Sequence, residues 1–415
     1  MPRTATTTAR TALGRALTAL TLSNLLGGVG VASGFAVGGL VIERAGGTAA
    51  AGVGQAAGVL GAGLVAVPLA RLAATRGRRW SLGIGYAVAV VGAGVILWGA
   101  ARNSLPILLA GLALFGVAQA TNLQSRYAAT DHVAPARRGR AMSLVIWATT
   151  VGTVLGPNLT DPGDRLGKHL GLPTLAGPYL FSLVGFALAG LVVVVAYPRF
   201  RADDDAARGR GARPVGALAA LRWAGREPAA RTGVVAVAGG HAIMVAVMVM
   251  TPLHMQHHGM TLKLVGLVIS LHTLGMYALS PVFGWLTDRV GAARTAWVGV
   301  GLFVGALGLG FAVAGGDTGP LTAAALFLLG LGWSATTLAG SAMIAATPDP
   351  AVRVSLQGAA DATMNYAGAA AAAVAGPVLA VGGFEAINAL GAVVLVVVVA
   401  ALGRHRAPTP VTEGA

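Results

Sequence analysis

The stretch GWLTDRVG at residues 284–291 lies between two apolar runs, 263–285 and 293–314. A helix of about 20 apolar residues is long enough to cross a hydrocarbon core of roughly 30 Å. The charged residues of this region gather in the short connection, as expected where ionisable side chains avoid the bilayer. The stretch therefore predicts two antiparallel membrane-spanning helices joined by a tight polar turn.

The same alternation of apolar run and polar connection continues along the whole chain of 415 residues, of which 55% are hydrophobic and only 10% charged. A soluble protein usually carries about 25% charged residues. We predict spans at 17–42, 49–71, 80–101, 105–128, 140–158, 177–197, 232–256, 263–285, 293–314, 319–346, 354–379 and 383–403. The predicted fold is thus all-α and integral to the membrane, with 12 transmembrane helices in two six-helix halves, 1–199 and 232–415, separated by a linker at 200–231.

The formal net charge of +15 follows the predicted topology. With the N-terminus inside, all but five of the 29 Arg and Lys residues fall in cytoplasmic segments, which is the positive-inside bias. We therefore expect both termini in the cytoplasm, membrane lipid as a partner, and no nucleic acid. The 27 Arg against 2 Lys indicate a GC-rich genome and a bacterial origin. The chain has no cysteine, which excludes disulfides and thiolate metal sites.

Six spans, a long polar linker and six further spans form the layout of the major facilitator superfamily, which this chain resembles over nearly its whole length. The stretch at 284–291 resembles the superfamily's signature loop between the second and third helices of a half. The equivalent stretch at 68–79 keeps the glycine and the basic tail but has Ala74 at the acidic position. The resemblance implies two halves that rock about a site near the bilayer midplane. Asp288 and Arg289 would hold a charge pair at the inner gate; alternatively, they cap a turn.

Two pairs of soft metal ligands lie near the middle of neighbouring predicted spans. Met244 and Met248 are four residues apart in one, and His272 and Met276 are four residues apart in the next. Residues at this spacing share a helix face, and thioether with imidazole suits cuprous copper. Methionine also fills space in apolar helices, and a buried histidine can be a structural residue or a proton carrier.

Further His and Met residues surround these pairs. His241 precedes Met244 by three residues and is expected near the same face. The outer end of the same span carries a cluster that could collect a metal ion and pass it inward: His254, Met255, His257, His258 and Met260. Interfacial histidines are common, so this cluster is weaker evidence than the two central pairs.

Within the superfamily, CcoA-like bacterial copper importers carry Met-x-x-x-Met in the seventh helix and His-x-x-x-Met in the eighth, and this chain resembles them at 244–248 and 272–276. The resemblance implies uptake of copper, as Cu(I), across the cytoplasmic membrane. Copper would be the transported substrate and not a prosthetic group. A cytoplasmic copper acceptor and assembly of a cbb3-type cytochrome oxidase are the implied destinations.

Asp361 is the clearest acidic residue inside a predicted span, which marks it as a functional candidate. It could relay protons, supply a harder metal ligand, or form structural hydrogen bonds with Gln357 and Asn365. Met364 is expected near the same face. A second polar group is predicted to form a network at the inner gate: Asn122, Gln124, Arg126 and Asp131.

Two other functions remain open. The stretch at 152–157, GTVLGP, resembles part of a motif of proton-coupled drug exporters, so an exporter of drugs or metabolites is the first alternative. The second is a copper sensor or assembly factor that binds metal without moving it. An enzyme is not expected, because the chain lacks a zinc-protease motif, a phosphate-binding loop and a nucleophile constellation.

Overall fold

The apolar runs fold into helices because a bilayer offers no hydrogen-bond partners, so each segment must satisfy its backbone internally. The computed structural model describes residues 3–46, 48–200, 215–260, 262–316 and 319–404. Among these residues, ten helices are long and apolar enough to cross a membrane, and a helix pair bent by 61° could form an eleventh span. The 54-residue helix α16 contains a non-helical Gly383 and divides there into two. The predicted all-α architecture is confirmed, and 12 spans are consistent with it.

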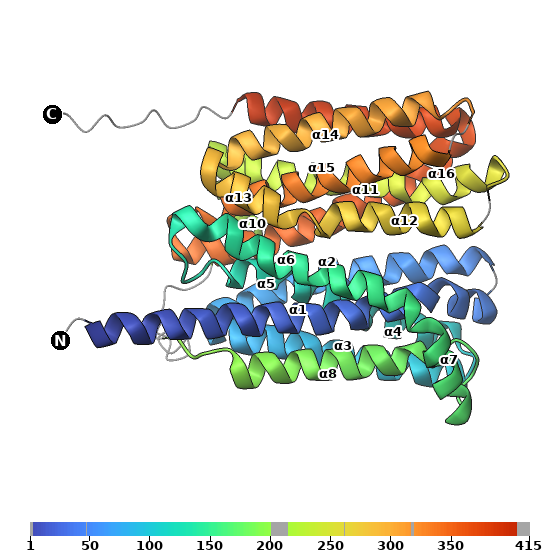
Figure 1. Ribbon diagram of the computed structural model, residues 1–415, viewed down its shortest axis with the longest axis horizontal. Helices are drawn as coiled ribbons and strands as arrows, with labels where there is room; N and C mark the ends of the chain where they lie inside the picture. The colour runs from blue at the N-terminus through green and yellow to red at the C-terminus, as the bar shows by residue number, and fades with distance from the viewer. Residues whose placement is uncertain (1–2, 47, 201–214, 261, 317–318, 405–415) are drawn as a thin grey trace.

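The first half runs from α1 to α8 and forms the lower part of Figure 1. Its elements are α1 (Arg3–Gly46), α2 (Thr48–Arg76), α3 (Arg78–Ala101), α4 (Leu105–Phe115), α5 (Val117–Ala128), the 3-10 turn η1 (Pro135–Arg137), α6 (Arg138–Asn158), α7 (Thr160–His169) and α8 (Pro178–Ala196). The predicted fourth span is divided at Gly116 into α4 and α5. Helix α7 was not predicted, because it is polar and hydropathy does not reveal it.

The second half forms the upper part of Figure 1. Its elements are α10 (Ala217–Arg226), α11 (Pro228–His257), α12 (Leu262–Tyr277), α13 (Ser280–Val290), α14 (Ala292–Ala312), α15 (Gly319–Ala345) and α16 (Pro350–Gly403). The predicted eighth span is broken between α12 and α13, where Pro281 stands at the start of α13. A proline is tolerated in the first turn of a helix because its missing N–H would have no partner there.

Glycines allow the helices of the first half to approach closely. Gly152 of α6 faces Gly28 and Val29 of α1, and a Cβ at Gly152 would lie 2.5 Å from the Val29 nitrogen. Gly156, one turn on, packs against Ala32 in the same way. Small residues at such contacts let backbones touch and are typical of membrane helix pairs. The glycines of the exporter-like stretch therefore have a packing role here.

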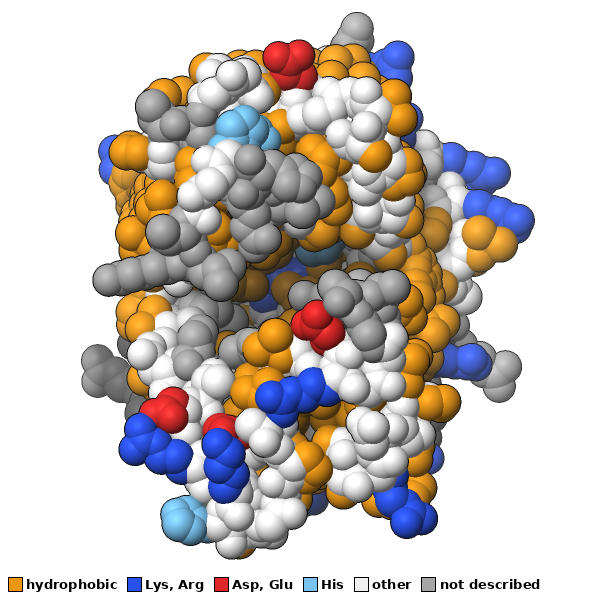
Figure 2. Space-filling view, turned by 90° about the vertical axis from the view of Figure 1, so that its right-hand side faces the viewer, with side chains coloured by type: hydrophobic (Ala, Val, Ile, Leu, Met, Phe, Trp, Pro, Cys, Tyr) orange, Lys and Arg blue, Asp and Glu red, His pale blue; other side chains and the backbone are white. Residues whose placement is uncertain are grey.

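The two ends of the bundle differ. Helix α1 begins and α16 ends at the same end, on the left of Figure 1, and we call this the inner end. Figure 2 looks onto the opposite, outer end and shows a hollow between the two halves. At the inner end the halves are joined by polar contacts, which are described below.

Candidate functional site

Helices α11 and α15 pack antiparallel with a defined register. The indole Nε1–H of Trp333 donates to Nδ1 of His241 over 3.0 Å. Two turns nearer the inner end, a Cβ at Gly233 would lie 2.8 Å from the carbonyl oxygen of Gly340. These two contacts fix which residues of α11 and α15 lie at the same depth.

Helices α12 and α15 run in the same direction, also in a defined register. Nδ1 of His272 lies 2.7 Å from the carbonyl oxygen of Leu326. One turn further along, a Cβ at Gly330 would touch the carbonyl oxygen of His272 and lie 2.9 Å from the backbone nitrogen of Met276. The stretch 272–276 of α12 therefore lies beside 326–330 of α15.

The two registers together place the predicted ligands at matching depths. Met244 lies three residues outward of His241, as Gly330 lies three residues outward of Trp333. Met248 lies seven residues outward of His241, which brings it to the depth of Leu326. At 1.5 Å per residue, Met244 lies near the depth of Met276 and Met248 near the depth of His272, and these two depths are about 6 Å apart.

The surroundings of these four side chains are apolar. Met244 and Met276 are 6% and 9% exposed and belong to one hydrophobic cluster, against which Met248 packs. His272 is fully buried. Because a carbonyl only accepts, Nδ1 of His272 carries the proton of the neutral ring, and Nε2 carries the lone pair. That Nε2 is buried and has no hydrogen-bond partner among the described residues. Metal-binding histidines likewise donate their other ring N–H to a carbonyl or carboxylate.

An aromatic group links the three helices on the inner side of the four ligands. The ring of Tyr277 on α12 meets Trp333 edge-on with centroids 5.6 Å apart, and Trp333 donates to His241 on α11. Because an indole N–H only donates, neutral His241 carries its proton on Nε2. His241, predicted as an accessory ligand, thus holds the tautomer opposite to that of His272 and presents a donor to its surroundings.

The structure keeps only part of the predicted outer His/Met cluster together, with the rings of His254 and His258 4.4 Å apart between centroids. His254 stacks on Phe384 at 4.3 Å, whereas Met255 is buried in a small cluster with Val268 and Leu326. His258 Nδ1 lies 2.9 Å from the main-chain oxygen of His254. The side chain of His257 lies outside the described residues. Among those that are described, no group of three or more His, Asp or Glu side chains could hold a metal.

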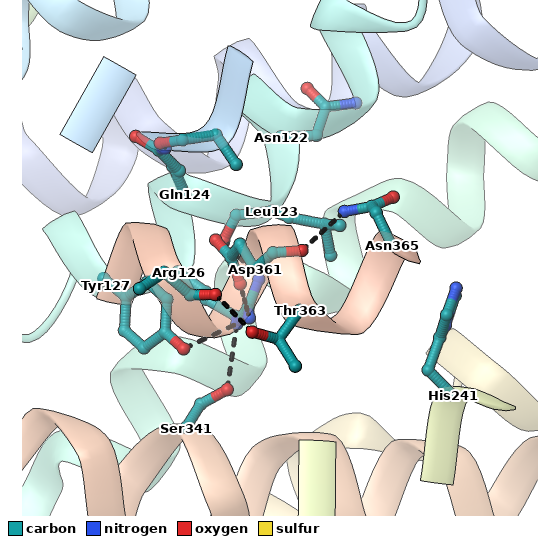
Figure 3. A network of polar contacts seen from close by, with 12 residues as sticks. Asn122, Leu123, Gln124, Arg126, Tyr127, His241, Ser341, Asp361, Thr363 and Asn365 are labelled. Atoms are coloured by element: carbon teal, nitrogen blue, oxygen red, sulfur yellow. Dashed lines mark hydrogen bonds and ion pairs between the residues drawn. The ribbon is translucent and has the colours of Figure 1, made fainter. Parts of the chain in front are cut away.

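A buried ion pair joins the two halves at greater depth (Figure 3). Arg126 Nη2 of α5 lies 2.6 Å from Asp361 Oδ1 of α16, and both side chains are 0% exposed. Arg126 also donates to Ser341 Oγ at 3.0 Å and to the carbonyl oxygen of Leu123 at 2.7 Å. Of the two structural hydrogen bonds predicted for Asp361, the one with Asn365 is present, but Asn365 Nδ2 donates to the main-chain oxygen of Asp361 and not to its carboxylate. The side-chain oxygen of Gln357 instead accepts from Arg78.

This ion pair lies well inward of the Met and His ligands. Gly368 of α16 packs against His241, and Asp361 is seven residues nearer the inner end, which corresponds to about 10 Å. Met364, expected beside Asp361, is buried in a different cluster together with Tyr127 and Phe283. The side chain of Met364 therefore packs within that cluster.

Two further contacts join the halves toward the inner end. Arg78 at the start of α3 lies 2.8 Å from Asp131 and also donates to Gln357 of α16 at 2.5 Å. The carboxylate of Asp288 accepts from the backbone N–H groups of Gly139 at 2.7 Å and Arg140 at 3.0 Å. The first N–H groups of a helix lack intrahelical partners, so Asp288 of α13 caps α6 across the boundary between the halves.

Arg289 does not share this contact. Its guanidinium lies over the ring of Trp285 at 5.2 Å, within the same helix. The ion pair near Asp288 is instead a long one, 3.9 Å to Arg140 Nε. Of the two predicted gate residues, only Asp288 has a described contact between the halves.

The sequence is similar to those of membrane transporters, in agreement with the fold described above. The family model described as Major Facilitator Superfamily matches residues 47–356 and 233–414. YdeG of Bacillus subtilis (strain 168), an MFS-type transporter, is 34% identical over 383 residues, which are 91% of this chain and 89% of YdeG. The riboflavin transporter RfnT of Brucella anthropi is 31% identical over 265 residues, 63% of each chain.

Solved structures share the fold. The human organic anion transporter MFSD10 superposes with a TM-score of 0.74 at 18% identity, covering 94% of this chain and 99% of that one. The transporter FucP in its outward conformation gives 0.71 at 16% identity, with 94% and 99% covered. A bacterial ferroportin homologue in an outward-facing state gives 0.70 at 16% identity, with 94% and 98% covered. At these identities the likeness concerns the fold alone.

Proposed function

The chain belongs to the Major Facilitator Superfamily, and from that premise we propose that it imports copper, as Cu(I), across the bacterial cytoplasmic membrane by alternating access. The superfamily consists of membrane transporters, not enzymes. The proposal covers the cargo, the direction of transport, and delivery to a cytoplasmic acceptor for assembly of a cbb3-type oxidase. The observation that supports it is the matched depth of Met244 with Met276 and of Met248 with His272.

The donor chemistry favours a soft monovalent ion. Thioethers are neutral and have no proton to lose, and His272 already has its Nε2 lone pair free. Metal affinity depends on deprotonated ligands, so this set can accept Cu(I) without releasing a proton. Neutral sulfur and imidazole donors select Cu(I) over hard cations, and their moderate strength allows the ion to leave again.

The two ends of the bundle suit uptake from the outer side. Figure 2 shows the hollow at the outer end, and the contacts of Asp288, Arg78 and Arg126 join the halves further in. This arrangement corresponds to an outward-facing state in which copper reaches the ligands from outside. Release inward requires these contacts to break as the halves rock.

Radiolabelled copper accumulation in cells tests the proposal. His272→Ala and Met248→Ala should abolish accumulation while the protein stays in the membrane. Met343→Ala is the control, because Met343 is buried in the hydrophobic cluster that contains Met244 and Met276 but lies ten residues inward of Trp333 on α15. Normal accumulation in His272→Ala and Met248→Ala would contradict copper as the cargo, as would an equal loss in Met343→Ala.

An organic cargo is the second candidate. The observation in its favour is the similarity to the riboflavin transporter RfnT, together with the aromatic and donor groups of Trp333, Tyr277 and His241. Riboflavin uptake, measured in the same cells, separates this candidate from copper import. Changed resistance to drugs on deletion would indicate the exporter, and copper binding without flux into proteoliposomes would indicate the sensor or assembly factor.

A further inference from the structure

In the ion pair between Arg126 and Asp361, one of the two carboxylate oxygens has no hydrogen-bond partner. Oδ1 of Asp361 takes the guanidinium contact at 2.6 Å, whereas Oδ2 is buried and has no hydrogen-bond partner. A carboxylate offers about four acceptor positions, and leaving a buried acceptor unpaired is costly. A proton bound to Oδ2 would remove the charge that makes this buried, unpaired acceptor costly.

We propose that Asp361 is the proton-binding residue of the transport cycle, and that a proton on Oδ2 releases Arg126 and so opens the inner end. The step is a simple protonation: the carboxylate becomes a neutral carboxylic acid and the charge attraction to Arg126 is lost. The inference rests on the chain being an alternating-access transporter, and it does not depend on copper being the cargo.

The ion pair can hold the inner end closed because its two charges belong to different halves. Arg126 stands on α5 and Asp361 on α16, 235 residues apart in sequence and in contact in space. A buried charge that loses its partner is strongly unfavourable. Once Asp361 is neutral, Arg126 must reach water, and it can do so only if α5 and α16 separate.

The groups around Asp361 leave Arg126 as its charged partner. Helix α15 contributes the hydroxyl of Ser341, which binds Arg126, and α2 packs its apolar residues against α16 at Gly358. The titratable or charged groups on the surrounding elements are Arg126 and Tyr127 of α5, His241 of α11, and Arg78 of α3 with its partner Asp131. Arg78 is held by Asp131 and Gln357, and His241 lies beyond Asn365 in Figure 3.

The direction of proton movement follows from the position of the pair. Asp361 lies about 10 Å inward of His241, between the outer hollow and the contacts of Arg78 and Asp288. A proton that arrives from the hollow breaks the ion pair and allows the inner end to open. It then leaves to the water on the inner side when the halves separate. The carboxylate then pairs with Arg126 again. One proton thus moves inward in each cycle, in the same direction as an imported cargo.

A single engineered thiol can report this opening, because the chain contains no cysteine of its own. Thr287 is 7% exposed, and its Cβ would lie 3.1 Å from a Cβ added at Gly139 across the boundary between the halves. In a Thr287→Cys background, the rate of maleimide alkylation should be low at neutral pH and should rise on acidification relative to the unfolded protein at the same pH. This normalisation removes the effect of pH on thiol reactivity itself.

Variants at the pair give opposite expectations. Asp361→Asn should be alkylated at least tenfold faster than the parent at neutral pH, with no further response to acid, and Asp361→Glu should keep the acid response. The double change Asp361→Asn with Arg126→Gln removes both charges, so it should restore slow alkylation and remain insensitive to pH. It also keeps the test valid if Asp361→Asn alone does not fold.

Three results would overturn the inference. The first is an acid response of parental size in the double variant, and the second is slow, acid-responsive alkylation in Asp361→Asn. The third is a response to sodium at constant pH in place of the response to acid, which would assign Oδ2 to a metal cation. The assay contains no cargo, so a failed copper proposal leaves its outcome unaffected.

Discussion

Replacing Asp288 by asparagine should shift the protein toward a state open at its inner end. Asp288 is 5% exposed and accepts two backbone N–H bonds from the first turn of α6, at Gly139 and Arg140. A hydrogen bond to a charged group contributes about 1.5–3 kcal/mol, and the N-terminus of a helix adds a favourable interaction with negative charge. Asparagine keeps one acceptor oxygen, so the expected loss is about 2 kcal/mol, roughly a 30-fold change in the equilibrium between the closed and open inner ends.

Distances between spin labels on the two halves would measure this shift. Arg137 in η1 and Arg294 in α14 are both exposed near the inner end, and cysteines there can carry the labels. The parent should give mainly one short distance, and Asp288→Asn should gain a longer one. Arg289→Gln is the matched control, because Arg289 stacks on Trp285 within its own helix. An unchanged distribution in Asp288→Asn, or an equal change in Arg289→Gln, would refute the reasoning.

Two further predictions concern glycines and are read from thermal unfolding in detergent. Gly152→Ala should lower the melting temperature, because the new Cβ would lie 2.5 Å from the Val29 nitrogen, whereas Gly94→Ala, with no atom within 4 Å, should be neutral or stabilising by up to about 1 kcal/mol. Gly383→Ala should cost about 1–2 kcal/mol because φ is 64° there, whereas Gly376→Ala, also in open surroundings, should not. Equal melting temperatures within either pair would contradict the packing or the backbone argument.

Hydropathy predicted the membrane helices because the bilayer imposes one rule on every span. It could not show that the fourth span is divided at Gly116 or the eighth between α12 and α13, because these breaks depend on packing and on one proline. Helix α7 was not predicted, for a different reason. Its residues are polar, so a scan for apolar runs passes over it.

The depth of the four predicted ligands follows from sequence because both pairs lie at fixed positions along their helices. The registers of α11 and α12 on α15 place Met244 with Met276 and Met248 with His272. The hydrogen-bonded state of the histidines could not be predicted, because it depends on the Trp333 indole and the Leu326 carbonyl on another helix. Those partners give His241 and His272 opposite tautomers.

The ion pair between Arg126 and Asp361 was missed for a related reason. Arg126 was assigned to a network at the inner gate, and Asp361 to a proton, a metal or its neighbours on the same helix. Opposite charges inside two predicted spans at similar depth were a usable signal, since buried charges in membranes pair with one another. Sequence spacing alone does not show which helix of one half faces which helix of the other.

X-ray absorption at the copper edge, on the purified protein loaded with Cu(I), tests the central claim most directly. We expect a first coordination shell of sulfur atoms with one imidazole nitrogen, which loses the nitrogen in His272→Ala and sulfur in Met244→Ala and Met248→Ala. A shell of nitrogen and oxygen alone, or a spectrum unchanged by these three substitutions, would contradict it.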